Sequence, residues 1–463
     1  MKRLSHDTKH KMIKILVTGT IVLALTFLAF IIPLRPSYSD TEKRDLAKFP
    51  EFHFSTLFSG EYFSDITSWF SDTVPFRDTL VTLNSKIQHI LGTSTVLQGF
   101  NEGNNADEIP DTPNTNLTEA DTSAESTSQG ETATDTADTT AADTTAAEET
   151  EPEGEYNELV QTLDAIMIAG DSGYEYYNFN QTVSDKYVKA VNTAASVLGN
   201  RATVYSMIIP TSIDITLDSR ARKKVNVSDQ KKAIDYMEGS MVDSVKKVEI
   251  FDTLKAHKDE YIYFRTDHHW TGLGAYYAYT KFCEVKGIEA LPLSSYTVRS
   301  FDNFLGSFYN DSGQSPTLAA NPDTVTTYTP PCNTKMTVTT SSGEKITTPM
   351  IYDATNSKPA YKYSTFIYGD NPYTVIENTD MTSGDSLILV KESFGNAIAP
   401  LFTYHYKYVY VVDYRYYSGK ISPLLDSVKT AEGCSGNVDV LYCNNISMTR
   451  SDSLVTKITN ALQ

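Results

Sequence analysis

One stretch of the sequence, residues 265–282, restricts the possible fold more than any other. It places an aspartate, two histidines and a tryptophan in the consecutive positions 267–270. The β-type residues 261–264 precede it, and a turn with two glycines leads from it into a helix-like run at 275–282. Open α/β sheets carry their chemistry at the carboxyl ends of strands. We therefore expect positions 267–270 at such an edge.

The flanking sequence supports this fold class, because strand-like and helix-like segments alternate after position 156. The expected strands and helices, in chain order, are 165–169, 183–199, 202–209, 229–244, 247–251 and 261–264. Such alternation predicts an α/β domain over residues 156–463, with a mostly parallel sheet flanked by helices.

A second polar turn follows the strongly apolar segment 386–390. Ser393 lies in this turn, just before the apolar helix start at 397–402, and two more buried strands are expected at 408–412 and 438–442. A serine on a sharp strand-to-helix turn is where α/β acyl-transfer enzymes hold a nucleophile. Backbone N–H groups at the start of such a helix can face an oxyanion.

Ser172 is a competing nucleophile. It follows the expected strand 165–169 in the sequence GDSGYEYYN, and Gly-Asp-Ser after a strand resembles the nucleophile block of the GDSL/SGNH hydrolases.

Residues 284–380 differ in kind from their surroundings. They are rich in Thr, Ser, Tyr, Pro and Asn and contain short β-type runs such as 335–340 and 345–351. We expect an irregular, partly antiparallel β-rich insertion over the sheet.

The amino-terminal part predicts a membrane anchor. Residues 1–14 carry five basic side chains, and residues 15–34 are uncharged and mostly apolar, long enough for a helix to span a bilayer. The basic flank predicts a cytoplasmic tail at 1–14, a single transmembrane helix at 15–34 and an extracellular remainder. A cleaved signal peptide is the competing interpretation. Residues 35–100 then show helical spacing around Pro75, which indicates a membrane-proximal helical segment.

Residues 101–155 form an acidic insert rich in Thr and Ala. Sixteen Asp and Glu and no Lys or Arg fall between positions 101 and 156, so the rest of the chain carries only −3 of the net charge of −19. A segment with so few large apolar residues cannot offset its conformational entropy, and we expect it to be disordered. The rest shows no basic stripe, which argues against a nucleic-acid partner. Cys434 and Cys443 could form a disulfide across a short loop.

Several motifs together resemble the DHHW protein family. They are the DHHW tetrad with its TGLGAYYAY tail, SDTEKRDLAKFP, VPFRD, GSFYNDSG at 306–313, LILVKESFGNAIAPLF and VVDYRYY at 411–417. Members of this family are membrane-anchored proteins, mostly of Gram-positive bacteria, and are similar to the alginate acetylation proteins. The resemblance implies an SGNH-hydrolase-like domain with a permuted strand order.

The resemblance also implies roles for individual residues. In the alginate-type enzymes an Asp-x-His pair precedes a distant serine, and the matching positions are Asp267, His269 and Ser393. His269 would act as the general base for Ser393, and Asp267 would orient the imidazole. The chain departs from the alginate proteins at His268, where they carry a small hydroxyl residue. The comparison also makes Ser172 a variable turn residue.

Other candidate residues follow from their positions alone. Gly369, Asn371 and Asn396 are candidate contributors to an oxyanion hole. Arg265 could bind an anionic substrate or pair with a carboxylate of the fold. An Asp-His-His run also occurs in metal-dependent phosphodiesterases, but the Asp-rich motifs which that chemistry needs are missing from the sequence. We therefore expect no metal and no cofactor.

The expected function is membrane-tethered O-acyl transfer, most simply O-acetyl transfer, to a cell-surface polysaccharide through an acyl-serine intermediate. The resemblance implies an acyl donor protein of the membrane-bound O-acyltransferase (MBOAT) type. Two alternatives remain open. A carbohydrate acetyl esterase would use the same triad with water as acceptor, and a non-catalytic glycan-binding or envelope-assembly protein would use only the pocket.

Overall fold

The computed structural model describes residues 106–117 and 166–462 as continuous segments. It also describes residues 35, 38–39, 44–45, 48–50, 62, 66, 69–70, 73 and 160–162. Two compact units divide the chain, Met1–Thr95 and Val96–Gln463. None of the helices within these residues has the length and apolar character needed to cross a bilayer, and the expected anchor at 15–34 lies outside them.

Few positions of the first unit are described. Strands β1 (Tyr38–Ser39) and β2 (Arg44–Asp45) pair antiparallel. Residues 62, 66, 69 and 70 are helical, in agreement with the helical spacing of this segment.

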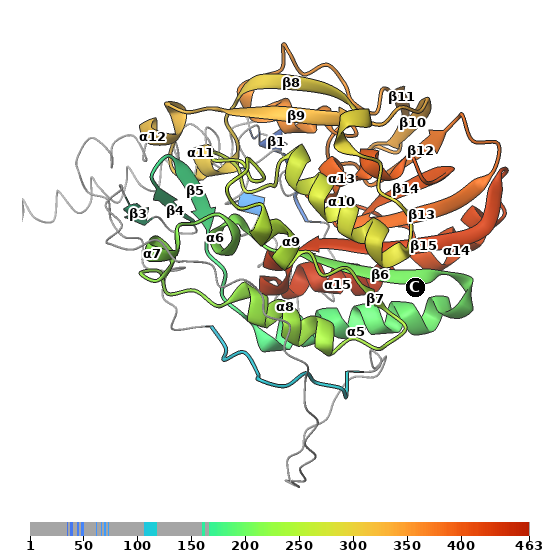
Figure 1. The fold of residues 1–463 in the computed structure, drawn as a ribbon, viewed down its shortest axis with the longest axis horizontal. Helices are drawn as coiled ribbons and strands as arrows, with labels where there is room; N and C mark the ends of the chain where they lie inside the picture. The colour runs from blue at the N-terminus through green and yellow to red at the C-terminus, as the bar shows by residue number, and fades with distance from the viewer. Residues whose placement is uncertain are drawn as a thin grey trace, which may run out of the picture. The chain divides into compact units, whose positions relative to one another are not determined.

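The centre of the second unit is an eight-stranded mixed sheet (Figure 1). In spatial order its strands are β11 (Lys345–Thr348), β10 (Thr334–Thr339), β12 (Tyr373–Asn378), β14 (Tyr408–Asp413), β13 (Gly384–Lys391), β15 (Cys434–Asn445), β6 (Thr203–Ile209) and β7 (Lys246–Lys247). The five strands from β14 to β7 pair parallel, whereas β12, β10 and β11 add an antiparallel edge. The predicted α/β class is confirmed, but the sheet is mixed, with four parallel and three antiparallel strand pairings.

Two hydrophobic cores lie on opposite faces of the sheet because side chains alternate along each strand. On β13, for example, Leu387 and Leu389 enter one core, and Ile388 and Val390 enter the other. The first core is closed by α9 (Phe251–Ala256), α10 (Gly272–Lys286) and α13 (Gly395–Phe402). The second is closed by α5 (Gln181–Leu198), α8 (Gln230–Gly239), α14 (Ile421–Lys429) and α15 (Asp452–Asn460). Figure 1 shows α10 and α13 on one side of the sheet and α5, α8 and α15 on the other.

Smaller elements complete the second unit. Strands β3 (Val160–Thr162), β4 (Ile166–Ala169) and β5 (Ser172–Glu175) form a separate antiparallel sheet, and β8 (Thr297–Phe304) pairs with β9 (Asp323–Thr329). The short helices are α6 (Ser212–Ile215), α7 (Ser219–Arg222), α11 (Ser307–Asp311), α12 (Pro316–Ala319), η2 (Gly199–Arg201), η3 (Leu293–Ser295), η4 (Pro359–Thr365) and η5 (Ile446–Arg450).

The segment 284–380 is β-rich and partly antiparallel, as predicted, but not all of it lies over the sheet. Strands β8 and β9 form a separate two-stranded sheet, whereas β12 pairs antiparallel with β14 and, with β10 and β11, extends the central sheet. Apolar residues on alternate positions of β10, such as Met336 and Val338, join the core with α10 and α13.

Residues 261–264 form no strand, contrary to the prediction. Their backbone pairs with the loop that follows, because Phe264 N–H donates to His269 O (3.1 Å) and Thr271 N–H donates to Ile262 O (2.9 Å). The segment therefore folds back on itself as a tight loop whose apolar side chains enter the core.

Part of the acidic insert is ordered. Residues 106–117 pack Ile109 and Leu117 into the core that contains α5 and α8. Asp107 accepts from the N–H of Gln181 (2.8 Å), at the start of α5. The prediction of disorder therefore does not extend to these residues, because two apolar side chains and local hydrogen bonds hold them. The rest of 101–155 lies outside the described residues.

Candidate active site

Ser393 lies on the turn between β13 and α13. The turn is tight, because Gly395 N–H donates to Glu392 O (3.0 Å) and a Cβ on Gly395 would come within 2.4 Å of Lys391 Cβ. Only a residue without a side chain fits this approach. The turn leaves Ser393 Oγ beyond the end of a central parallel strand, the position at which α/β folds carry functional groups.

Asp267, His268 and His269 lie on the loop between α9 and α10. The loop ends at Thr271, whose side chain caps α10 by accepting from Gly274 N–H (3.3 Å). Gly306 approaches so closely that a Cβ there would lie 2.2 Å from Asp267. The backbone of this neighbouring segment thus fixes the position of the carboxylate.

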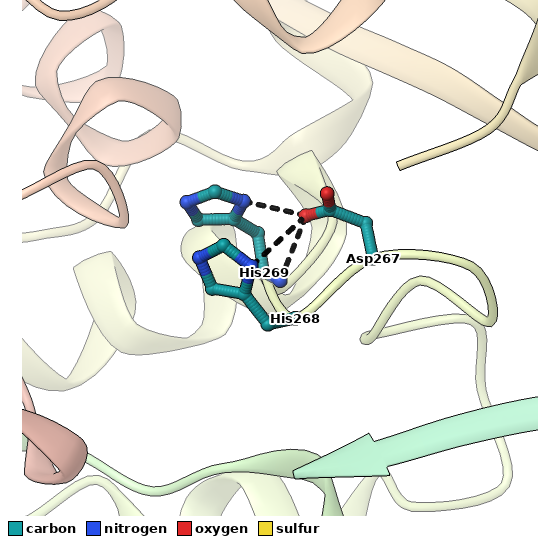
Figure 2. Close-up of side chains that lie close together, drawn as sticks. All are labelled: Asp267, His268 and His269. Carbon is teal, nitrogen blue, oxygen red and sulfur yellow. Dashed lines mark hydrogen bonds and ion pairs between the residues drawn. The ribbon is translucent and has the colours of Figure 1, made fainter. Parts of the chain in front are cut away.

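The structure brings Asp267, His269 and Ser393 into one chain of hydrogen bonds. Nε2 of His269 lies 2.7 Å from Ser393 Oγ, and Nδ1 lies 2.5 Å from Asp267 Oδ1. The carboxylate also accepts from the N–H of His269 (3.0 Å) and of Ser307 (2.8 Å). Figure 2 shows the Asp267 carboxylate turned toward both imidazoles. With the Nδ1 proton held by Asp267, Nε2 is free to accept the serine proton.

Aromatic side chains hold the two segments together. The His269 ring stacks on Tyr363, with centroids 4.1 Å apart, and Tyr363 O–H donates to Ser393 O (3.0 Å). Trp270 Nε1–H donates to Phe394 O (3.0 Å). All three residues of the hydrogen-bonded chain are buried, and this burial strengthens the electrostatic interactions between them.

The charges of this cluster follow from its burial and its neighbours. Burial acts to raise the pKa of Asp267, but the imidazoles of His269 and His268 outweigh it and hold this pKa below its usual range. Burial, with the charge of His269, lowers the pKa of His268. Near neutral pH the cluster therefore contains an ionised Asp267 beside a neutral His268.

His268 has a different environment from His269. Its Nδ1 lies 2.7 Å from Ser307 Oγ, and its side chain is 34% exposed. It lines a cavity of about 430 Å³ that also contacts Ser393, Glu392 and Arg415. His268 therefore faces the space in which a substrate could bind.

Glu392, which the sequence reasoning did not single out, lies beside the nucleophile. Its Oε2 accepts from Phe394 N–H (3.1 Å) and lies 3.3 Å from Ser393 Oγ, and its Oε1 accepts from Asn445 N–H (3.0 Å). Burial raises the pKa of Glu392 against the opposing charge of Arg415. The only feature of the sequence that could have pointed to Glu392 is its position directly before Ser393.

The other candidate binding residues have structural partners. Asn396 Nδ2 donates to Asp370 Oδ1 (2.8 Å), and Asn371 Nδ2 donates to Tyr368 O (2.9 Å). Gly369 N–H donates to Phe366 O (2.9 Å). None of the three lines the cavity beside Ser393. Arg265 lies 3.6 Å from the buried Asp323 and donates to Pro322 O (3.2 Å). Of the two predicted roles, pairing with a carboxylate of the fold is the one the structure shows.

Ser172 and the cysteines lie outside the site. The Ser172 hydroxyl donates to Asp171 (2.9 Å) on an exposed turn. Cys434 and Cys443 are free thiols in the same strand, β15, opposite Gly384 and Lys391 of β13, which places them roughly 20–25 Å apart, too far for a disulfide.

The donor atoms of Asp267, His268 and His269 lie within 4.8 Å of one another, close enough for a metal ion to be considered. The hydrogen bonds fit a proton-transfer site better. Both Asp267 oxygens accept from N–H groups, and Nε2 of His269 faces a serine hydroxyl.

A comparison with models of known protein families identifies the family of this chain. A model of the DHHW protein family matches residues 42–412, which include Asp267, His269 and Ser393. The chain belongs to the DHHW protein family. No curated protein sequence matches it.

Solved structures agree with this assignment. A DHHW family protein from Eubacterium siraeum is 26% identical, with a TM-score of 0.58, over 65% of this chain and 97% of that chain. PatB1 of Bacillus cereus with a sulfonyl adduct is 18% identical, with a TM-score of 0.52, over 66% of this chain and 100% of that chain. At 18% identity, the similarity to PatB1 shows that the two proteins share a fold.

Proposed function

We propose that this DHHW family member is an extracytoplasmic, membrane-anchored O-acyltransferase that acylates a cell-surface polysaccharide through an acyl-Ser393 intermediate. The observation that carries the proposal is the hydrogen-bonded chain from Asp267 through His269 to Ser393. A hydroxyl, a base and an orienting carboxylate in this order are the components of nucleophilic acyl transfer.

The first half-reaction forms the acyl-enzyme. Ser393 Oγ attacks the carbonyl carbon of the acyl donor while its proton passes to Nε2 of His269. Asp267 stabilises the resulting imidazolium through Nδ1. The leaving group then departs with the proton from Nε2, and the acyl group stays on Ser393.

The second half-reaction transfers the acyl group. A sugar hydroxyl gives its proton to Nε2 of His269 and attacks the acyl carbon, and Ser393 Oγ leaves and recovers the proton. The cavity beside Ser393 and His268 offers room for the sugar. Water as acceptor would turn the same steps into ester hydrolysis.

The similarity to PatB1 supports the proposal that the site holds an activated nucleophile. Sulfonyl reagents react with activated nucleophiles, and a PatB1 structure carries a sulfonyl adduct. The resemblance of the sequence motifs to the alginate acetylation proteins favours acetyl as the acyl group. It also supports an SGNH-like domain with a permuted strand order, in which Asp267 and His269 precede Ser393.

The anchor and the donor complete the proposal. The segment 15–34 would hold the catalytic domain outside the membrane, with residues 1–14 in the cytoplasm. Activated acyl groups would then be supplied by a membrane partner of the MBOAT type.

Mass spectrometry after incubation with a small acetyl ester tests the nucleophile. The full-length wild-type protein should carry one acetyl group on Ser393. The Ser172→Ala variant should do the same, and the Ser393→Ala variant should carry none. Acetylation that persists in Ser393→Ala and disappears in Ser172→Ala would overturn the assignment. Equal and slow ester turnover by wild type and Ser393→Ala would favour a non-catalytic glycan-binding protein.

Partitioning of the acyl-enzyme separates transferase from esterase. Acylated wild-type protein is offered a glycan oligomer in water, and acetylated glycan and free acetate are measured. Transfer in preference to water supports the proposal. Acetate as the sole product would identify an esterase.

A further inference from the structure

Two cavities near the nucleophile share part of their lining. The first, of about 430 Å³, contacts Ser393 and His268, and the second, of about 280 Å³, contacts Tyr416 and Lys420. Tyr414 and Arg415 line both cavities. A ligand longer than one sugar ring could therefore extend from Ser393 past Arg415 into the second cavity.

Two hydroxyls at the first cavity lack partners. Tyr414 Oη and Ser447 Oγ are buried and make no hydrogen bond to the residues that the structure describes, and both residues line this cavity. Buried polar atoms are nearly always hydrogen-bonded, so such exceptions call for an explanation. Ser447 Oγ would reach a sugar hydroxyl once its side chain turns into the cavity, beside Tyr414.

The charges at the first cavity are largely compensated. Arg450 pairs with Glu175 (3.1 Å), and Arg415 pairs with Asp413 (2.7 Å) and Asp370 (2.9 Å). The Glu392 carboxylate accepts from two backbone N–H groups. This cavity therefore suits a neutral, hydroxyl-rich ring.

The second cavity has the opposite character. Its lining contains Lys420 and Lys457 but no Asp or Glu. The two ammonium groups donate to main-chain oxygens, at Asn460 O (2.5 Å) and Arg415 O (3.0 Å), and neither forms an ion pair with a described carboxylate. Tyr416, which is 46% exposed, lies beside them, with the Arg415 guanidinium 5.2 Å from its ring centroid. Uncompensated positive charge beside an exposed ring suits an acidic sugar unit.

We propose that the two cavities form one acceptor site for an anionic glycan. The sugar to be acylated binds at Tyr414 and Ser447, and an acidic unit further along the glycan binds at Lys420 and Lys457. The inference rests on the proposed function and deepens it by naming the class of acceptor. The acidic group is a carboxylate or a phosphate, since a lysine ammonium pairs with either.

Three size-matched acceptors test the charge preference. They are a galactose tetrasaccharide, the corresponding galacturonate tetrasaccharide and a galactose tetrasaccharide carrying one phosphate. Acetyl transfer from a small ester by the full-length protein should favour one or both anionic acceptors. In the Lys420→Gln/Lys457→Gln variant this preference should fall by on the order of tenfold, because two partly exposed ion pairs are lost.

Lys429→Gln is the matched control. Lys429 also donates to a main-chain oxygen, Arg201 O, at 3.0 Å, but it lines neither cavity. Its substitution should leave the acceptor preference intact. A wild-type preference for the neutral acceptor, or an undiminished anionic preference in the double lysine variant, would overturn the inference.

Direct binding separates this inference from the proposed function. Calorimetric titration of Ser393→Ala with the same tetrasaccharides requires no chemistry. If wild type forms no acyl-serine but Ser393→Ala binds an anionic tetrasaccharide through Lys420 and Lys457, the catalytic proposal fails and the site stands. If the acyl-serine forms but no anionic tetrasaccharide binds more tightly than the neutral one, the acceptor-site inference fails and the catalytic proposal stands.

Discussion

The Tyr363 ring stacks on His269 with an interplanar angle of 12°, while its hydroxyl donates to Ser393 O (3.0 Å). One side chain from η4 therefore contacts both the base and the backbone of the nucleophile. These two partners lie 124 positions apart in the sequence. Tyr363 is therefore a direct link between the two segments, in addition to the hydrogen bond from Trp270 Nε1–H to Phe394 O.

Tyr363→Phe should lower the free energy of unfolding by roughly 1–2 kcal/mol, because the buried Ser393 carbonyl loses its donor. The acylation rate should fall while KM for a small ester changes little. Chemical denaturation and stopped-flow acylation measure the two effects. Tyr352→Phe is the control, because Tyr352 bonds to Ser357 in a part-buried setting. Equal effects of the two substitutions would contradict a special role for Tyr363.

Asp267→Asn should reduce acyl-serine formation by about three to four orders of magnitude. The asparagine amide would place a donor against either Ser307 N–H or His269 Nδ1–H. The favoured response is a tautomer in which Nε2 of His269 carries the proton and no longer accepts from Ser393. Burst-phase kinetics measure the loss. Asp171→Asn, on the exposed turn beside Ser172, should retain the wild-type burst, and comparable losses in both variants would argue against this role of Asp267.

Gly306→Ala tests the close approach that fixes the carboxylate. The new Cβ would lie 2.2 Å from Asp267 Cβ and Oδ2, so Asp267 must move. We expect a stability loss of about 1–3 kcal/mol and a large loss of activity per folded molecule. Gly436→Ala, which meets no atom within 4 Å but has φ +90°, should lose stability without losing specific activity. A fully active Gly306→Ala protein would show that Asp267 needs no such placement.

The sequence predicted what depends on local pattern. The apolar run 386–390 became β13, and the turn after it carries Ser393 beside His269. Residues 261–264 have strand-like composition, yet their backbone hydrogen bonds are made with the loop that follows. Composition alone does not predict which backbone partner a segment will have. Likewise, the acidity of 101–155 concealed Ile109 and Leu117, two apolar anchors in an otherwise polar segment.

The candidate oxyanion residues could not be judged from sequence for a related reason. Whether an amide is available depends on its tertiary partner, and Asn396 lies beside Asp370, 26 positions away. Glu392 was missed because its importance arises from two backbone donors, one of them on β15. Tertiary contacts of this kind leave no periodic signal.

Glu238 predicts a pH dependence of stability that is independent of the site. This α8 residue is 4% exposed, and its Oε1 makes no hydrogen bond to the described residues. Burial, with the nearby charges of Glu249 and Asp235, raises its pKa to about 8 from the usual 4.5. The folded state thus keeps a proton that the unfolded state loses between pH 4.5 and 8, so the stability contributed by this group falls as pH rises through that window.

Glu238→Gln should therefore stabilise the protein in a pH-dependent way. The amide is neutral at every pH, so the gain should be absent below about pH 4.5 and should grow to roughly 5 kcal/mol above pH 8. Denaturant unfolding of the wild-type and variant proteins between pH 4 and pH 9 measures this difference. Asp426→Asn, on α14 and ion-paired with Arg201, removes a surface carboxylate elsewhere in the fold, and should produce no such rise. A pH-independent effect of Glu238→Gln would mean that the buried carboxyl does not titrate in this window.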